Sequence, residues 1–207
     1  MLPLLLASSS VYRRDLLSRL RLPFTCSSPD IDEGHHQGET AIELVKRLSL
    51  EKARALAASH PNHLIIGSDQ VAVLDGRIIG KPHTYEKAHQ QLTTASGASV
   101  SFLTGLTLLN SQTGHYQTDC VPFTVHMRSL SAEQIERYLR AEQPYDCAGS
   151  FKCESLGISL FEEMIGQDQT TLMGMPMIKL CHILRELKIL VPESLSLNSG
   201  CNLCLNL

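Results

Sequence analysis

Residues 63–80, HLIIGSDQVAVLDGRIIG, predict a buried β-strand followed by a tight hairpin. The run HLII is so apolar that its strand belongs in the middle of a sheet, and it ends in the small and acidic cluster Gly67 to Asp69. The β-rich runs VAVL and RIIG then flank Asp75 and Gly76, a dipeptide typical of two-residue hairpin turns. A central strand next to a hairpin indicates a sheet of several strands.

Segments with helical periodicity alternate with strands in the first part of the chain. Short strands are expected at 2–6 and 22–28, and the leucines between them recur at helical spacing over about 10–20. Thr40 and Glu43 form a capping box before a long amphipathic segment. These patterns predict a strand, a helix and a second strand, followed by a long helix.

The rest of the chain continues this alternation. A helix is expected in KPHTYEKAHQQL, antiparallel strands in SVSFLTGLTLLN and HYQTDCVPFTVHMR, and another helix after the capping box of Ser131 and Gln134. Pro176 suits the first turn of a final helix, MPMIKLCHILREL. Strands interleaved with helices predict the α/β class with a mixed sheet. We expect one domain over residues 1–191 and a loosely held tail at 192–207, where charge and periodicity are lost.

The composition argues against several classes of protein. A formal net charge of -3 provides no global attraction to nucleic acid or to an anionic membrane, so an anionic ligand needs a local basic cluster. The opening apolar run is too short for a membrane-spanning helix or a signal peptide. The 7 cysteines, an odd number in a chain of this size, are expected to be reduced thiols. We therefore expect a cytoplasmic protein that binds neither nucleic acid nor membrane.

The stretch LLLASSSVYRRDLL, residues 4–17, predicts an anion site. Ser8 and Ser10 fall in the loop between the first strand and the first helix, where backbone N–H groups at the helix start are available to an anion. Arg13 and Arg14 follow within one turn and add donors suited to phosphate oxygens. The helix dipole disfavours arginines there, which indicates an anion that offsets the cost. The alternative is that Ser10 only caps the helix and both arginines face solvent.

Two acidic positions and two lysines extend the predicted site. Asp69, at the end of the central strand, is expected at the rim of a cleft where ligands of open α/β sheets bind; the alternative is an ordinary turn residue. Glu33 lies in PDIDEG, and carboxylates beside phosphates indicate a divalent cation between them; otherwise the segment is a solvated turn. Lys52 and Lys81 are point charges suited to phosphate, although each alone is typical of a surface residue.

The order of these motifs resembles the Maf family of nucleotide pyrophosphatases. LASSSVYRRDLL is followed by DIDE, LEKA, IIGSDQV, IGKP, CAGSFKCESLGI and TLMGMP, from the first strand to about residue 190. The resemblance implies an elongated mixed β-sheet flanked by helices, with two lobes around a cleft, as in the inosine triphosphate pyrophosphatases. It implies a modified nucleoside triphosphate as the partner. The oligomeric state is left open, and a homodimer is compatible with the sequence.

Within the family, the sequence resembles most the branch that hydrolyses 7-methyl-GTP. Tyr12 stands where that branch usually has tryptophan and the pyrimidine-cleaving branch has arginine, and an aromatic ring suits a cationic 7-methylated base. Gln70 and Glu154 match the amide and acidic specificity positions of the branch. A carboxylate accepts hydrogen bonds from the Watson–Crick edge of guanine and favours a positive charge on the base. The alternative is that Glu154 faces solvent.

The resemblance also implies a mechanism. Asp69 accepts a proton from the water that attacks the α-phosphorus, Glu33 and Asp69 face a divalent metal cation, Mg or Mn, and pyrophosphate leaves. Hydrolysis of 7-methyl-GTP would keep modified nucleotides out of nucleic acids. Two alternatives stay open: the same chemistry on dTTP or UTP, and a nucleotide-binding regulator of septum formation without turnover. The predicted phosphate-binding residues are Ser8, Ser10, Arg13, Arg14, Lys52 and Lys81.

Overall fold

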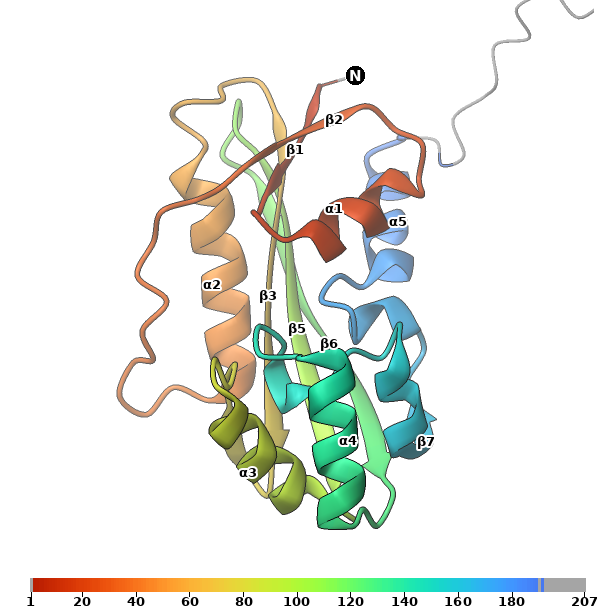
Figure 1. Cartoon of the computed structure of the whole chain (residues 1–207). Coiled ribbons are helices and arrows are strands. Elements are labelled where there is room, and N and C mark those ends of the chain that lie inside the picture. The colour runs from red at the N-terminus through yellow and green to blue at the C-terminus, as the bar shows by residue number, and fades with distance from the viewer. Residues whose placement is uncertain (1, 190, 192–207) are drawn as a thin grey trace, which may run out of the picture.

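A computed structural model describes residues 2–189 and residue 191 of the chain. Within these residues, seven strands form one mixed sheet in the order β2-β1-β3-β5-β6-β7, with β4 paired to β3 (Figure 1). The strands are β1 Leu4–Ala7, β2 Phe24–Ser27, β3 Leu64–Leu74, β4 Arg77–Ile79, β5 Ser99–Asn110, β6 Tyr116–Met127 and β7 Phe161–Ile165. The α-helices are α1 Val11–Ser18, α2 Ala41–Ala55, α3 Tyr85–Ala95, α4 Ala132–Glu142 and α5 Met177–Glu186. The predicted α/β class with a mixed sheet is confirmed.

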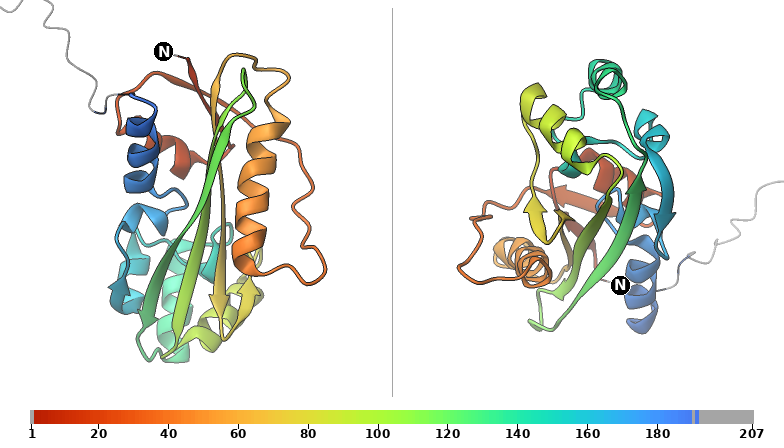
Figure 2. Two further views of the ribbon diagram at one scale, coloured as in Figure 1. Left: turned by 180° about the vertical axis from the view of Figure 1, so that it is seen from behind. Right: turned by 90° about the horizontal axis from the view of Figure 1, so that it is seen from below.

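Parallel pairing is confined to one end of the sheet. β1 pairs in parallel with β2 and with β3, whereas β4, β5, β6 and β7 pair antiparallel with their neighbours. Side chains alternate across β1: Leu4 and Leu6 pack in one cluster with α1 and α5, and Leu5 and Ala7 pack in another with α2. Figure 2 accordingly shows α2 on one face of the sheet and α1 and α5 on the other.

Two glycines let α2 lie directly on the sheet. A Cβ at Gly67 would come 2.0 Å from the carbonyl oxygen of Ser49, and a Cβ at Gly105 would come 2.0 Å from that of Val45. Both contacts involve the backbone of α2, so no side chain fits between the helix and β3 or β5 at these points. The close approach brings Lys52, on α2, next to β3.

Gly67→Ala is expected to lower the free energy of unfolding by about 1–3 kcal/mol, because α2 must move away to admit the methyl group. The measurement is urea denaturation followed by circular dichroism. Gly80→Ala is the matched control, since a Cβ there meets nothing within 4 Å. Equal midpoints for the two variants would show that α2 does not lie this close to β3.

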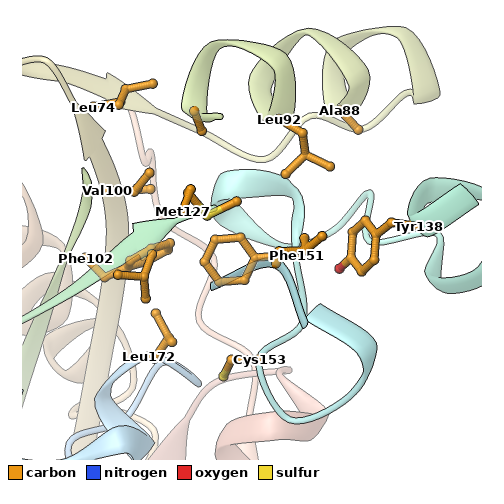
Figure 3. Close-up of a cluster of buried hydrophobic side chains, with 14 of the residues drawn as sticks. Leu74, Ala88, Leu92, Val100, Phe102, Met127, Tyr138, Phe151, Cys153 and Leu172 are labelled. Atoms are coloured by element: carbon orange, nitrogen blue, oxygen red, sulfur yellow. The ribbon is translucent and has the colours of Figure 1, made fainter. Parts of the chain in front are cut away.

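The end of β3, β5 and β6 that lies away from β1 is covered by α3, α4 and the segment after α4. Their buried side chains form one cluster with β5 and β6, in which Phe151 lies between Phe102 and Tyr138 (Figure 3). The rings of Phe102 and Phe151 meet edge to face with centroids 5.3 Å apart. The molecule therefore has separate hydrophobic clusters toward its two ends, in agreement with the two lobes that the family resemblance implies.

One edge of β3 is open for part of its length. β5 pairs with residues 64–73 along the other edge, while on this edge β1 pairs with Leu64–Ile66 and β4 pairs with Ala72–Leu74. Among the described residues, no strand lies beside residues 67–71 on this edge. The predicted end of the strand at Asp69 is therefore wrong. Pairing with β5 continues the strand through Asp69, which lies opposite Gly105, to Val73, and Leu74 pairs with β4.

Local sequence signals are confirmed at most element ends. Both capping boxes are present, at Thr40 and at Ser131, and Asp75 and Gly76 form the hairpin turn with φ of 49° and 75°. Pro176, which was expected in the first turn of the final helix, is instead the N-cap of α5, and the helix begins at Met177. No helix in the described part of the chain is long and apolar enough to span a membrane.

Two further predictions concern the tail and the cysteines. The predicted tail at 192–207 lies outside the described residues, so the division of the chain into a domain and a tail stays a prediction. The described cysteines are free, as expected for reduced thiols: Cys26, Cys120, Cys147, Cys153 and Cys181.

Candidate active site

A cleft of about 1370 Å³ opens at the unpaired edge of β3. Residues 7–13, which lead from β1 into α1, form one wall, and residues around β4 form another. The connection between β2 and α2 contributes a third wall. The candidate residues that line the cleft are Ser8, Ser10, Tyr12, Arg13, Glu33, Lys52, Asp69, Gln70 and Lys81.

The serine loop after β1 is shaped by its own hydroxyl groups. Ser8 Oγ accepts the backbone N–H of Ser10 at 3.1 Å, and Ser10 Oγ, the N-cap of α1, accepts that of Arg13 at 3.4 Å. Among the described residues, the N–H groups of Val11 and Tyr12 have no partner. Since α1 has no acidic residue in its first turn, the helix start remains positive and suited to an anion.

Arg13 is held from a distant segment. Its Nε donates to the carbonyl oxygen of Gly174 at 2.8 Å, and the same oxygen accepts from Ser68 Oγ at 2.9 Å. Burial lowers the pKa of the Arg13 guanidinium, while the nearby carboxylates of Asp69 and Glu33 act in the opposite direction. With Nε fixed by a carbonyl, the two terminal nitrogens are left for the forked contact that arginine makes with phosphate.

Lys52 lies between the two candidate acidic residues. Its Nζ is 2.6 Å from Asp69 Oδ1 and 2.9 Å from Glu33 Oε1. The side chains of Lys52 and Asp69 are 8% and 10% exposed, whereas that of Glu33 is 61% exposed. An ammonium has three donors, so one remains for a substrate oxygen. The predicted convergence of these three residues is therefore present, with Lys52 as the link between the carboxylates.

Gln70 is oriented by hydrogen bonds that fix which end of its amide faces the cleft. Nε2 donates to Thr104 Oγ1 at 2.8 Å and to the carbonyl oxygen of Thr171 at 2.6 Å. Thr104 Oγ1 itself donates to that carbonyl at 3.1 Å, so its oxygen accepts from Gln70. Because the Thr171 carbonyl can only accept a hydrogen bond, the end of the Gln70 amide that faces Thr171 must be its nitrogen. Gln70 Oε1 is left as an acceptor for a ligand N–H group.

Tyr12 lines the cleft, and Glu154 lies near Tyr12. Burial raises the pKa of the Tyr12 phenol, and the neighbouring Cys147 and Glu154 raise it further. Glu154 is exposed and is not among the lining residues of the cleft. Arg14 also lies outside the lining; it is exposed and pairs with Asp15 at 3.6 Å. The functional roles of Arg14 and Glu154 stay predictions.

Comparison with known proteins places the chain in a family. A family profile described as "Maf-like protein" matches residues 3–187. The chain belongs to the Maf-like protein family. A "7-methyl-GTP pyrophosphatase" of Pseudomonas fluorescens strain Pf-5 is 74% identical over 184 residues, which cover 89% of this chain and 96% of the relative.

Further relatives of this Maf-like protein carry the same description. One from P. fluorescens strain Pf0-1 is 71% identical and covers 93% of this chain and 100% of the relative. One from P. aeruginosa is 62% identical and covers 91% and 98%. Among solved structures, the Staphylococcus aureus Ham1 protein is 14% identical with a TM-score of 0.44, over 61% of this chain and 72% of that one.

The acidic residues of this Maf-like protein fit a divalent cation only together with a substrate. In the described part of the chain, no group of three or more His, Cys, Asp or Glu side chains forms a metal site. Glu33 and Asp69 nevertheless converge on one point, the Nζ of Lys52. Mg²⁺ is commonly bound through one or two carboxylates together with substrate phosphates. The donor set therefore fits such a cation once phosphate oxygens are present.

Three residues that support the site of this Maf-like protein were not predicted from the sequence. Gly174 holds Arg13 through its backbone, and Thr104 and Thr171 orient Gln70. Gly174 and Thr171 act through carbonyl groups, which every residue type has, so no side-chain pattern could reveal them. Gly174 does have φ of +97°, and a Cβ there would come 3.3 Å from Arg13 Nε. A glycine in the motif TLMGMP is the only signal that the sequence offers for this contact.

Proposed function

We propose that this protein hydrolyses 7-methyl-GTP to 7-methyl-GMP and pyrophosphate. The observation that carries the proposal is the identity of 62–74% with relatives named 7-methyl-GTP pyrophosphatase over about nine-tenths of the chain. The cleft supports it, because phosphate donors, two carboxylates and an aromatic ring line one space. The physiological role that follows is the removal of a modified nucleotide before it enters nucleic acid.

Phosphate binding is assigned to the serine loop and to the cationic side chains of the cleft. The hydroxyls of Ser8 and Ser10 and the N–H groups at the start of α1 face one part of the triphosphate. Arg13 presents its terminal nitrogens, and Lys52 and Lys81 add point charges from α2 and from the segment after β4. Arg14 would assist only from outside the cleft lining.

Asp69 is assigned as the base for the attacking water. Its Oδ1 is held by Lys52 at 2.6 Å, and among the described residues its Oδ2 makes no hydrogen bond, so that oxygen is available to accept a proton. The water then attacks the α-phosphorus and pyrophosphate leaves. Glu33 and Asp69 would hold a divalent cation together with phosphate oxygens. When bound, such a cation neutralises phosphate charge and lowers the pKa of a water molecule.

Base selection is assigned to Tyr12, Gln70 and Glu154. The Tyr12 ring offers a face to the cationic 7-methylated base, a contact worth about 0.5–2 kcal/mol. Gln70 Oε1 accepts an N–H group from the Watson–Crick edge of guanine. The Glu154 carboxylate accepts a second and adds a favourable charge. Arginine in place of Tyr12 and a neutral residue in place of Glu154 would instead suit dTTP or UTP.

The substrate panel that tests this proposal is 7-methyl-GTP, GTP, dTTP and UTP, with pyrophosphate release measured in Mg²⁺ or Mn²⁺. The highest kcat/KM is expected for 7-methyl-GTP. Preference for dTTP or UTP would contradict the assigned base selection. Tight nucleotide binding without any product would favour the alternative of a regulator of septum formation.

Glu154→Gln is expected to reduce the preference for 7-methyl-GTP over GTP by about 3- to 30-fold, because the neutral amide no longer favours the cationic base. The measurement is the ratio of kcat/KM for the two nucleotides. Glu162→Gln, a substitution at an exposed position on β7, is the matched control and should keep the ratio. An unchanged ratio in Glu154→Gln would show that Glu154 does not contact the base.

A further inference from the structure

The β2–α2 connection, residues 28–40, carries Glu33 and forms one wall of the cleft. Figure 1 shows it running along the outer side of α2 before it turns into the start of that helix. Most of its residues are exposed, and Glu33 reaches Lys52 with a side chain that is itself 61% exposed. A single ion pair of this kind contributes little, so another contact must hold the connection in place.

Arg47, on α2, makes that contact with two groups of the connection, a backbone carbonyl and a carboxylate. Its Nη2 donates to the carbonyl oxygen of Gly34 at 2.8 Å. Its Nε and Nη2 bind the two carboxylate oxygens of Glu39 at 2.6 and 2.9 Å. Gly34 follows Glu33 directly in the chain, so Arg47 fixes the backbone next to the acidic residue of the cleft.

We propose that Arg47 is a positioning residue for the hydrolysis, which holds the β2–α2 connection on α2 and thereby keeps the Glu33 carboxylate on Lys52, the lysine that also pairs with Asp69. The inference rests on the proposed function and extends it, since Arg47 is not among the residues that line the cleft. Arg47 acts through the Gly34 carbonyl and the Glu39 carboxylate, and it does not touch the substrate.

The geometry of the Arg47 contact makes it stronger than an ordinary surface ion pair. The side chains of Arg47 and Glu39 are 17% and 8% exposed, and the forked pair uses two parallel hydrogen bonds. The hydrogen bond from Arg47 lowers the pKa of Glu39 to about 2 and raises that of Arg47. The pair therefore contributes stability above pH 4.5 and loses it only as the pH falls toward 2.

The other hydrogen bonds near Glu33 stay within the connection. Asp32 Oδ1 accepts the N–H of Gly34 at 2.8 Å, and Glu39 Oε2 accepts the N–H of His36 at 3.1 Å. These contacts shape the connection but do not join it to the rest of the molecule. Ile31 packs against the cluster beneath α2, three residues from Gly34. Thr40, at the end of the connection, bonds with Glu43 in the capping box of α2. Among the described residues, Arg47 is the polar link between α2 and residues 34–39.

A double-mutant cycle of Arg47→Met and Glu33→Gln tests the proposal. Arg47→Met alone is expected to lower kcat by about 10- to 100-fold, because displacement of a group in the site by about 1 Å has an effect of this size. In the Glu33→Gln background, the same substitution is expected to change kcat less than about twofold. If the fold-losses in kcat of the two single variants multiplied in the double variant, the two residues would act independently, and the proposal would be overturned.

Two carboxylate variants separate the contacts that Arg47 makes. Glu51→Gln removes the pair of Arg47 Nη1 with Glu51, at 3.0 Å and within α2, and should leave kcat unchanged. Glu39→Gln removes the charge that holds the fork on the connection and should lower kcat in the same direction as Arg47→Met. Equal kcat values for the two variants would contradict the proposal, and both variants serve if Arg47→Met fails to fold.

Hydrogen exchange provides a readout that does not depend on turnover. Arg47→Met is expected to speed amide exchange in residues 33–38 while exchange in β3 and β5 stays as in the wild type. Unchanged exchange at 33–38 would overturn the proposal even if activity fell. If the wild type released no pyrophosphate from 7-methyl-GTP, the proposed function would fail, and the exchange experiment would still decide whether Arg47 holds the connection.

Discussion

Asp69→Asn is expected to lower kcat for 7-methyl-GTP by about 10²- to 10⁴-fold, the usual contribution of a general base. The amide cannot accept a proton from water, and it no longer carries the charge that pairs with Lys52. KM should change much less, because the proposed phosphate-binding residues Ser8, Ser10 and Arg13 are unchanged. The measurement is pyrophosphate release at saturating nucleotide, with circular dichroism to show that the variant is folded.

Asp119→Asn is the matched control for this effect. Asp119, on β6, also pairs with a lysine, Lys179, but lies outside the cleft lining. The control variant should keep the kcat of the wild type, which separates the loss of a base from the loss of an ion pair. Turnover of folded Asp69→Asn within about twofold of the wild type would remove Asp69 from the mechanism.

Arg13→Lys is expected to lower kcat/KM for 7-methyl-GTP by about 10²- to 10³-fold, comparable to the loss of one preorganised donor. Lysine keeps the charge but has neither the Nε that binds the Gly174 carbonyl nor the fork that we propose binds phosphate. The measurement is steady-state kinetics over a range of nucleotide concentrations. Because phosphate binding is lost in the ground state as well, KM is expected to rise.

Arg19→Lys controls for the same chemical change on an exposed residue. Arg19 is the C-cap of α1 and lies outside the cleft lining. Its variant should have the kinetic constants of the wild type. Equal kinetics for Arg13→Lys and the wild type would mean that the guanidinium fork of Arg13 does not bind the triphosphate.

Local features of the fold were predictable from the sequence because each depends on neighbouring residues. Thr40 with Glu43 and Ser131 with Gln134 are capping boxes, and each pair satisfies donors at the start of one helix. The Asp75-Gly76 turn likewise depends on two residues that tolerate positive φ. The serine loop and Arg13 were expected at an anion site for the same local reason.

The long-range arrangement of the site was not predictable from local patterns. Asp69 was expected at a strand end, but pairing with β5 extends β3 beyond it, and the cleft arises because β1 and β4 leave residues 67–71 uncovered. Arg13 and Gly174 are 161 positions apart, and Gln70 and Thr171 are 101 apart. Contacts between such distant segments depend on the completed sheet.

Hydrolysis of 7-methyl-GTP in ¹⁸O-labelled water tests most directly whether the reaction takes place at the α-phosphorus. We expect one atom of label in the phosphate of 7-methyl-GMP and unlabelled pyrophosphate, both read by mass spectrometry. Label in pyrophosphate would place the attack on the β-phosphorus, and release of orthophosphate would place it on another bond. Either result would contradict the assignment of Asp69 to a water that attacks the α-phosphorus.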